Sequence, residues 1–341
     1  MKKKIILLVT DIVIAALILL GVWIINYKIP QKGTKAVTAA QLQQLQSGVN
    51  GQSSSLKKTD IVTSTEDWHQ KFADKFTDKV VATENTYTSP DLSITLSSGS
   101  YDTGKLDRSN SGKHEKYGTS ISYTLADIYI GDITCFQTAF AQDTYGVGYE
   151  EKLSDMSARM RSVLAVNGDS YSNNRHKDNG TIIRNGVIYR SKQSGAETCV
   201  LNWDGTMDIY PPGQVDKQTL IKKGAYQSWI FGPSLLDENG KANTSFYTWD
   251  YIRQSHPRTA IGYYEPGHYC LLVVDGRQPS SRGMFPDEMA AFFEKLGCKA
   301  AYNLDGGHCS FMTYKDQIVN HPYKPEHQVS DGIFITEAIA G

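Results

Sequence analysis

The chain has 341 residues, of which 40% are apolar and 21% are charged, and its formal net charge is −1 at pH 7. This composition is too apolar for a disordered chain and can supply the core of one large or two small domains. Because there is no basic excess to neutralise phosphates, the sequence argues against a nucleic-acid partner.

The first predicted element is an apolar helix within residues 1–29. Three lysines at positions 2–4 precede the run IILLVTDIVIAALILLGVWII, which is about as long as the core of a bilayer requires. The lysines predict a cytoplasmic N-terminus, which places the rest of the chain outside the cytoplasm. A cleaved signal peptide is the alternative, but the run is longer than a signal core and no small-residue cleavage site follows it. We therefore expect a single-pass anchor in the cell membrane, with an extracytoplasmic domain.

Residues 30–62 are rich in Gln, Ser, Thr, Lys and Gly, and they cannot bury enough apolar surface to fold independently. This composition predicts a flexible polar stalk. A short helix follows within DWHQKFADKF, because Trp68, Phe72 and Phe76 recur at the spacing of one helix face.

From about Tyr87 the pattern changes to short β-rich runs separated by turn residues. Asn185-Gly186 and Asp204-Gly205 each lie between alternating apolar runs, which is the strongest local signal of a hairpin. Helices are expected within KLSDMSARMRSVL and from Pro286 to Gly297. The sequence therefore predicts an α+β fold, with one mostly β domain over residues 63–341 and a few packed helices.

The five cysteines form no CxxC pair, which argues against a zinc cluster and predicts no metal site built from thiolates. The stretch NGDSYSNNRHKDN, residues 167–179, gathers oxygen ligands suitable for calcium, although its spacing does not fit an EF-hand loop. We expect no required cofactor, with structural calcium as the alternative.

Polar residues and glycines concentrate in four stretches, each at the end of an apolar strand. These stretches are VNGDSYSNN (166–174), HPRTAIGYY (256–264), VVDGRQPSSRG (273–283) and NLDGGHCSF (303–311). Loops at the ends of rigid strands commonly carry functional sites. Four such stretches together favour a site over a set of ordinary turns.

In these stretches the chain resembles the phosphodiester glycosidases. The matching segments are Asn167-Gly168, FGPSLL (231–236), HPRTAIG (256–262), VVDGR (273–277), AYNLDGG (301–307) and QVSDGIFI (328–335). The resemblance covers residues 120–337 and keeps the order and spacing of the motifs. It implies one catalytic domain that hydrolyses a sugar-1-phosphodiester, releasing a free sugar and a phosphomonoester. With the predicted topology, the expected substrate is a phosphodiester-linked glycan of the cell envelope or exopolysaccharide.

On this reading Asp305 stabilises or attacks the positive charge that develops at the anomeric carbon. Arg258 binds the phosphate, because a guanidinium can donate two parallel hydrogen bonds to phosphate oxygens; a structural salt bridge is its alternative role. Asp275 serves either as acid and base or as the partner that orients Arg258 or Arg277.

Further expected binding residues surround this centre. Arg277 is expected to bind substrate as well. Asn167, Gly168 and Asp169 either hydrogen-bond sugar hydroxyls or only form a turn, and Gly306 and Gly307 can direct backbone N–H groups toward the phosphate. The turn departs from the family pattern at His308 and Cys309 but keeps Ser310. The imidazole of His308 either narrows the pocket, protonates the leaving phosphate or is a tolerated variation.

Two other functions compete with this reading. Cys309 could be the nucleophile of a hydrolase, with His256, His268 or His321 as its base. The chain could also be a non-catalytic surface protein that binds anionic glycans and does not need Asp305 for affinity.

Overall fold

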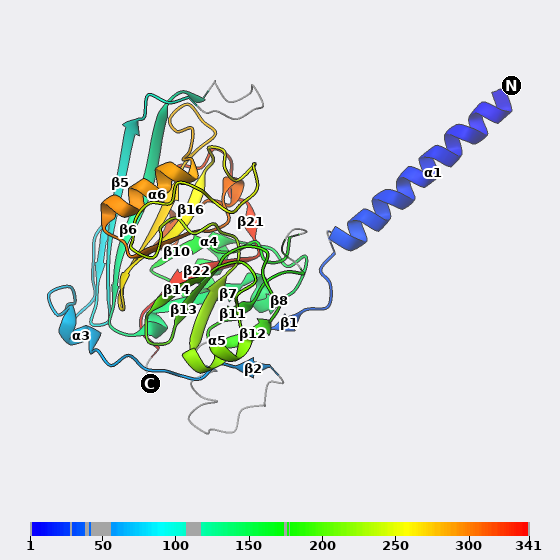
Figure 1. Cartoon of the computed structure of the whole chain (residues 1–341). Coiled ribbons are helices and arrows are strands. Elements are labelled where there is room, and N and C mark those ends of the chain that lie inside the picture. Colours follow the sequence, from blue (N-terminus) through cyan, green and yellow to red (C-terminus); the bar gives the residue numbers. More distant parts are fainter. Residues whose placement is uncertain are drawn as a thin grey trace.

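The structure is a computed structural model that describes residues 2–27, 29–37, 41, 56–106, 117–173, 176 and 178–339. Within these residues every strand pair of the sheets is antiparallel, and two sheets form the framework of one domain (Figure 1).

The larger sheet has the strand order β18-β16-β17-β6-β5-β4-β3 within the described residues. Its strands are β3 (Val81–Ala82), β4 (Thr86–Thr88), β5 (Leu92–Asp102), β6 (Ser120–Ile130), β16 (Arg258–Glu265), β17 (His268–Val274) and β18 (Ala300–Asn303). Alternate residues face opposite sides, so that Leu271 and Val273 of β17 join the main core, whereas Leu272 and Val274 pack with α6 (Pro286–Leu296). The helix α6 starts at a proline and ends before Gly297, as its sequence predicts.

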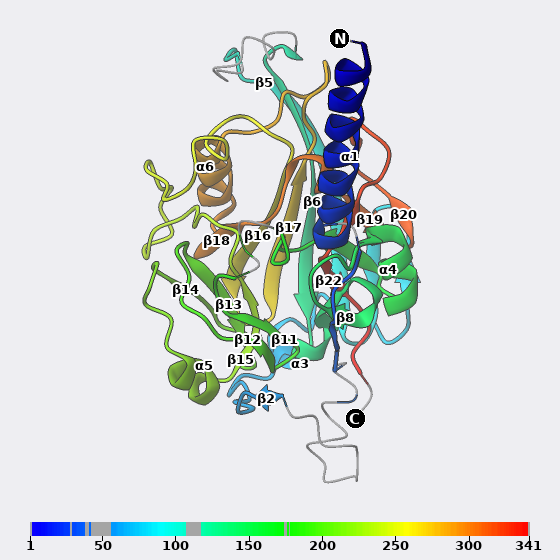
Figure 2. The same ribbon diagram turned by 90° about the vertical axis from the view of Figure 1, so that its right-hand side faces the viewer.

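The second sheet has the order β20-β19-β10-β22-β7 in the described part of the chain. Its strands are β7 (Phe136–Phe140), β10 (Leu164–Asn167), β19 (Met312–Tyr314), β20 (Gln317–Ile318) and β22 (Asp331–Ile335). Leu164 and Val166 of β10 join the main core, while Ala165 packs on the other face with α4 (Leu153–Met160). The two sheets therefore share one core, and Figure 2 shows α6 and α4 on opposite sides of them.

Smaller sheets complete the domain. One joins β14 (Met207–Tyr210), β13 (Thr198–Asn202) and β15 (Ala225–Trp229), and another joins β11 (Ile182–Arg184), β12 (Val187–Arg190) and β2 (Lys57–Lys58). The remaining described elements are β1 (Thr34–Lys35), α3 (Trp68–Lys71), β8 (Thr144–Tyr145), β9 (Glu151–Lys152), α5 (Lys217–Lys223), β21 (Gln328–Val329) and the 3-10 helices η2 (Ile133–Cys135), η3 (Ala141–Asp143) and η4 (Gly307–Cys309). In the β11–β12 hairpin, Asn185 and Gly186 have φ of 51° and 75°, as a tight two-residue turn requires.

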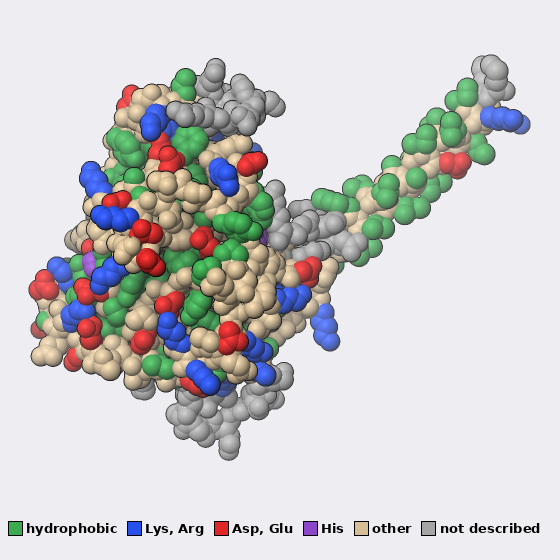
Figure 3. Space-filling view, viewed as in Figure 1, with side chains coloured by type: hydrophobic (Ala, Val, Ile, Leu, Met, Phe, Trp, Pro, Cys, Tyr) green, Lys and Arg blue, Asp and Glu red, His purple; other side chains and the backbone are tan. Residues whose placement is uncertain are grey.

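The N-terminal helix α1 (Lys2–Tyr27) projects from the domain (Figures 1 and 3). Its segment Lys3–Ile25 has a mean hydropathy of 3.0 and 0% of it is buried, so it is long and apolar enough to cross a membrane or to act as a signal sequence. Parts of the predicted stalk are strands of the domain, because β1 pairs with β8 and β2 pairs with β12. Residues 38–40 and 42–55 of the predicted stalk lie outside the described residues.

The predicted fold class is confirmed: the described chain is mostly β with a few packed helices. The predicted hairpins at Asn185-Gly186 and Asp204-Gly205 are both present. The helix expected within residues 67–76 is shorter than its apolar pattern, because α3 ends at Lys71. Trp68 and Phe72 are nevertheless buried, so the apolar residues pack as expected even where the helix stops.

Candidate active site

The backbone of Asp305 is held where β10, β16 and β18 approach one another. The Asn167 amide donates to the Asp305 carbonyl oxygen at 2.7 Å, and the Asp305 N–H donates to the Gly168 carbonyl oxygen at 3.1 Å. Thr259 of β16 donates in turn to the Asn167 side-chain oxygen at 2.6 Å. Three of the four polar stretches therefore meet at one residue. Asn167, expected to contact sugar hydroxyls, instead has both ends of its amide bonded to protein and positions Asp305.

The carboxyl group of Asp305 is partly buried and accepts a hydrogen bond of 2.9 Å from the Gly306 N–H. Burial raises the pKa of Asp305 to about 6, and the negative charge of Asp331 adds to this increase. Hydrogen bonds from Gly306 and Cys309 lower the pKa of Asp305 and partly offset this increase. At neutral pH the carboxylate is therefore mostly ionised but more basic than an ordinary aspartate, as suits a group that stabilises or attacks a cationic centre.

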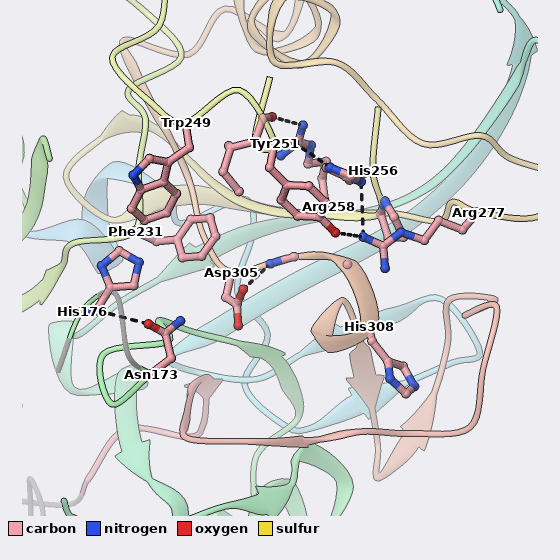
Figure 4. Close-up of a pocket in the computed structure, with 14 residues that line it drawn as sticks. Asn173, His176, Phe231, Trp249, Tyr251, His256, Arg258, Arg277, Asp305 and His308 are labelled. Atoms are coloured by element: carbon pink, nitrogen blue, oxygen red, sulfur yellow. Dashed lines mark hydrogen bonds between the residues drawn. The ribbon is translucent and has the colours of Figure 1, made fainter. Parts of the chain in front are cut away.

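Asp305 lies where two cavities meet, of about 190 Å³ and about 360 Å³. Asn173 also lines both. The first cavity contains Phe231 and Trp249, and Figure 4 shows these aromatic side chains on one side of Asp305 and Arg277 on the other. A substrate placed over Asp305 therefore meets an aromatic surface in one direction and a guanidinium in the other.

Arg277 extends over the turn that carries Asp305. Its guanidinium donates to the hydroxyl groups of Tyr251 at 2.7 Å and Tyr323 at 2.8 Å, and it lies 3.3 Å from His256 Nδ1. A Cβ atom on Gly307 would lie 3.2 Å from the Arg277 Nη2, and the φ of 70° at Gly307 also favours glycine. Gly307 therefore gives the guanidinium room to approach the turn.

Arg258, the first choice for phosphate binding from the sequence, has a different environment. It is buried, and its guanidinium donates to the carbonyl oxygens of Met284 at 3.0 Å, Ile252 at 2.6 Å and Gln254 at 2.5 Å. Burial lowers the pKa of Arg258, and the positive charge of Arg277 lowers it further. Arg258 also lines the first cavity, but its hydrogen bonds support the loop that bears Tyr251. These hydrogen bonds favour Arg277 over Arg258 for phosphate binding.

Asp275 accepts hydrogen bonds from Asn320 Nδ2 and the His321 N–H, both at 3.0 Å, and from the Ser122 hydroxyl at 3.3 Å. It is buried, which raises its pKa. These contacts connect β6 to the segment before Tyr323. The structure therefore places Asp275 behind the site, where it fixes loops, rather than against either described cavity as the acid and base.

The backbone N–H groups of the Asp-Gly-Gly turn donate hydrogen bonds to other groups of the protein. The Gly306 N–H donates to the Asp305 carboxylate, and the Gly307 N–H donates to the Pro257 carbonyl oxygen at 2.9 Å. These two N–H groups therefore do not point to a phosphate, contrary to the expectation from the sequence. Ser310 is buried behind the turn.

The side chain of His308 points away from Asp305 (Figure 4). Its Nε2 lies 2.9 Å from the Pro325 carbonyl oxygen, and its ring is near those of Tyr323 and His327, with centroids 5.6 Å and 4.7 Å away. His308 therefore packs on the loop that supplies Tyr323. This position argues against protonation of the leaving phosphate by His308.

Gly168 and Asp169 belong to the buried surroundings of Asp305. A Cβ atom on Gly168 would lie 2.8 Å from the Asp331 carboxylate, and Asp169 accepts a hydrogen bond from the Ile230 N–H at 2.6 Å. Burial, followed by the charge of Asp331, raises the pKa of Asp169 to about 7. Both residues were expected to bind substrate, but in the structure they lie behind Asp305.

Sequence reasoning missed the aromatic residues of the site. Trp249 and Tyr251 line the first cavity and are 41% and 49% exposed, and Phe231 was noted only as part of a family motif. The run YTWDY, residues 247–251, was a usable signal, because three aromatic residues alternate in a polar segment without a strand pattern.

The thiol of Cys309 is a poor candidate for a nucleophile. Burial and the neighbouring negative charge of Asp305 raise the pKa of this thiol well above its ordinary value. Of its proposed bases, His268 stacks between Tyr129 and Tyr264 and contacts Asp127 at 2.7 Å.

No group of three or more His, Cys, Asp or Glu side chains among the described residues is arranged to hold a metal ion. Residues 174, 175 and 177 of the candidate calcium stretch lie outside the described part of the chain. Structural calcium stays a prediction.

The family model described as phosphodiester glycosidase matches residues 160–336. The chain belongs to this family. The protein YomE of Bacillus subtilis (strain 168), a prophage-derived uncharacterised protein, is 34% identical over 193 residues, which are 55% of this chain and 29% of YomE. The matched region thus covers less than a third of that relative.

Solved structures show the same fold. The catalytic domain of zebrafish N-acetylglucosamine-1-phosphodiester alpha-N-acetylglucosaminidase, auto-inhibited by pro-peptide, has a TM-score of 0.53 and 18% identity, covering 73% of this chain and 89% of that domain. A hypothetical protein from Synechocystis has a TM-score of 0.50 and 12% identity, covering 72% of this chain and 62% of its own. The resemblance recognised from the sequence is confirmed by the family match.

Proposed function

We propose that this phosphodiester glycosidase hydrolyses a sugar-1-phosphodiester and releases a free sugar and a phosphomonoester. The observation that carries the proposal is the position of the Asp305 carboxylate at the junction of two cavities, with the Arg277 guanidinium beside it. The name of the zebrafish relative describes a reaction of the same class, which supports the assignment.

In the proposed reaction the bond between the anomeric carbon and the phosphate oxygen breaks, and its electron pair leaves with the phosphate. Asp305 either stabilises the resulting oxocarbenium-like charge or attacks the anomeric carbon and is later displaced by water. The oxygen of water becomes the anomeric hydroxyl group, and one proton of that water is released. Because a phosphomonoester is a weak base, departure of the phosphate requires no strong general acid.

Arg277 is the proposed phosphate ligand. Its guanidinium can donate two parallel hydrogen bonds to phosphate oxygens, and the hydroxyl groups of Tyr251 and Tyr323 hold it in one orientation. The nearby charge of Arg258 makes this side of the cavity more positive. A bound phosphate would relieve the repulsion between the two guanidinium groups.

On the other side of Asp305, Phe231 and Trp249 are the proposed surface for the sugar ring. Aromatic faces with a few convergent polar groups are common in ligand pockets, and Asn173 supplies an amide at this position. The helix α1 is proposed as a single-pass anchor that places the domain outside the cytoplasm, where phosphodiester-linked envelope glycans and exopolysaccharides occur.

A substrate screen tests the function. The full chain, purified in detergent, is incubated with sugar-1-phosphodiesters that differ in the sugar and share methanol as the other alcohol, and free reducing sugar is measured. We expect release from at least one diester and not from the methyl glycoside of the same sugar. If diesters bind but none is hydrolysed, the chain is a non-catalytic binder of anionic glycans.

A further inference from the structure

The second cavity at Asp305 extends to the N-terminal helix. It is lined by Trp23 of α1 as well as by Glu150, Cys309 and His327. Trp23 lies close to the C-terminal end of the apolar segment Lys3–Ile25. One cavity therefore connects the candidate catalytic carboxylate with the end of the candidate membrane span.

The connection between α1 and the domain is short and built into the fold. The Ile29 N–H still donates to the Ile24 carbonyl oxygen at 3.0 Å, and the Gln31 N–H donates to the Val147 carbonyl oxygen at 3.0 Å. The strand β1 then pairs with β8. A few residues after the helix, the chain is thus already fixed to the loop that borders the second cavity.

Close packing holds this connection against the domain. A Cβ atom on Gly148 would lie 3.0 Å from the Pro30 Cα, and one on Gly33 would lie 2.3 Å from Thr144 Cγ2. These glycines let the connecting segment lie against the loop at Val147. Among the described residues, the exit from α1 is therefore a packed segment and not a free tether.

The length and the exposed apolar side chains of α1 suit a lipid environment. Its 23-residue apolar segment is about 35 Å long, slightly more than the roughly 30 Å hydrocarbon core of a bilayer. Apolar side chains along it are widely exposed, for example Leu7 at 68% and Leu19 at 69%. In a bilayer, Trp23 would lie at the interface, the preferred depth of tryptophan. The second cavity, and with it Asp305, would then open at the level of the lipid headgroups.

We propose that the substrate is a sugar-1-phosphodiester whose second alcohol is a membrane lipid. This inference rests on the proposed function and specifies its substrate class. In such a molecule the phosphate lies at the headgroup level, where Asp305 and Arg277 can reach it, and the lipid chain stays in the bilayer. Cleavage of the anomeric carbon–oxygen bond by water releases the free sugar into the aqueous phase and leaves the lipid monophosphate in the membrane.

The first test measures turnover by the full chain in phosphatidylcholine vesicles. Two substrates carry the same sugar 1-phosphate, one esterified to a polyprenol in the same vesicles and one to methanol in solution. A variant carries about 15 Gly and Ser residues inserted directly after Tyr27, which frees the domain from its fixed position at the bilayer. We expect the insertion to lower kcat/KM for the lipid substrate on the order of tenfold and to leave the soluble substrate unaffected. Equal kinetics of parent and insertion variant on the lipid substrate would overturn the proposal.

The second test does not depend on turnover. A fluorescent amino acid is placed at Gln328 of β21, a residue that lines the second cavity. In a control variant it is placed at the exposed residue Gln70 of α3, because α3 lies on the opposite side of the domain from α1 (Figure 1). Quenching by nitroxide lipids in the vesicles should be stronger at position 328. Equal quenching at both positions contradicts the membrane-facing site, even if soluble diesters are hydrolysed. Stronger quenching at 328 without hydrolysis of any diester instead rejects the proposed function and keeps the membrane-facing geometry.

Discussion

Two neighbouring regions of this molecule contain an arginine and an aspartate, but they use the charges differently. Arg184 and Asp331 are 2% and 1% exposed, and the Arg184 Nε donates to the Asp331 carboxylate at 3.1 Å. Arg277 instead donates to tyrosine hydroxyls, and the Asp305 carboxylate accepts from the backbone of its own turn. The Arg184–Asp331 pair is buried and neutralises itself, so it supports the fold, whereas Arg277 and Asp305 line a cavity without pairing with each other and stay available to a substrate.

Removing one partner of the buried Arg184–Asp331 pair should have the largest effect, because it destabilises the fold. Replacement Arg184→Met leaves Asp331, and beside it Asp169, as buried carboxyl groups without their cation. We expect a loss of about 3–5 kcal/mol in the free energy of unfolding, measured by chemical denaturation. The double replacement Arg184→Met/Asp331→Leu should recover much of this loss. A single variant as stable as the parent would show that the pair does not support the fold.

The replacement Asp305→Asn tests the carboxylate that lines the two cavities. It keeps the size of the side chain and removes the charge, so turnover should fall on the order of 10²–10³-fold while the diester still binds. The measurement is steady-state release of free sugar, with binding followed by calorimetry. Full activity in a folded variant would remove Asp305 from the mechanism.

Matched replacements of Arg277 and Arg258 should affect different properties, substrate binding and stability respectively. Arg277→Gln should weaken binding of the phosphodiester by about 1.5–3 kcal/mol and leave a neutral glycoside unaffected, because charge-assisted hydrogen bonds are lost. Arg258→Gln should mainly lower the melting temperature, because its donors hold the Met284, Ile252 and Gln254 carbonyl groups. The opposite pattern would restore Arg258 as the phosphate ligand.

The raised pKa of Asp305 predicts two effects of pH. Activity should fall as the pH drops below about 6, because the required carboxylate becomes protonated. Stability should change in the other direction: the folded chain binds this proton more tightly than the unfolded chain does, so ionisation destabilises the fold as the pH rises from about 4 to 6. Melting temperatures of the parent, compared with those of Asp305→Asn, should therefore decrease across this range. A constant difference between the two proteins would contradict the raised pKa.

The smallest effect is expected from His308→Gly. The imidazole packs on the segment that contains Pro325 and Tyr323, and Tyr323 accepts a hydrogen bond from Arg277. Removing the imidazole should therefore disturb Arg277 only indirectly and change turnover only a fewfold. Kinetic assays beside the parent measure this effect. A loss as large as that of Asp305→Asn would mean that His308 takes part in the chemistry.

Local sequence signals predicted much of the fold because they depend on neighbouring residues. Short β-rich runs separated by turn residues predicted the strands after about Tyr87, the Asn185-Gly186 pair predicted a hairpin, and Pro286 with Gly297 predicted the ends of α6. The helix α3 shows the limit of such signals, because its apolar spacing continues beyond the point at which the helix ends.

The candidate site was predicted in part. Asp305 and Arg277 were both named from the motifs, and the structure places them along one cavity. The roles of Arg258, Asp275 and Asn167 could not be derived in the same way, because a polar residue at a strand end looks the same whether its partner is a substrate or a backbone carbonyl group. Trp249 was missed because the alternating aromatic residues of YTWDY lie in a loop and do not form a strand.

The sequence by itself determined the apolar N-terminal helix, the mostly β domain and its membership of the phosphodiester glycosidase family, because each depends on composition, periodicity or motifs of neighbouring residues. Only the tertiary structure decided that the Arg258 guanidinium bonds to backbone carbonyl groups whereas that of Arg277 bonds to tyrosine hydroxyl groups, and that Trp23 shares a cavity with Asp305. Such arrangements depend on contacts between residues far apart in the chain. A buried guanidinium such as that of Arg258 bonds to the acceptors that packing brings within reach, and the local sequence does not identify them.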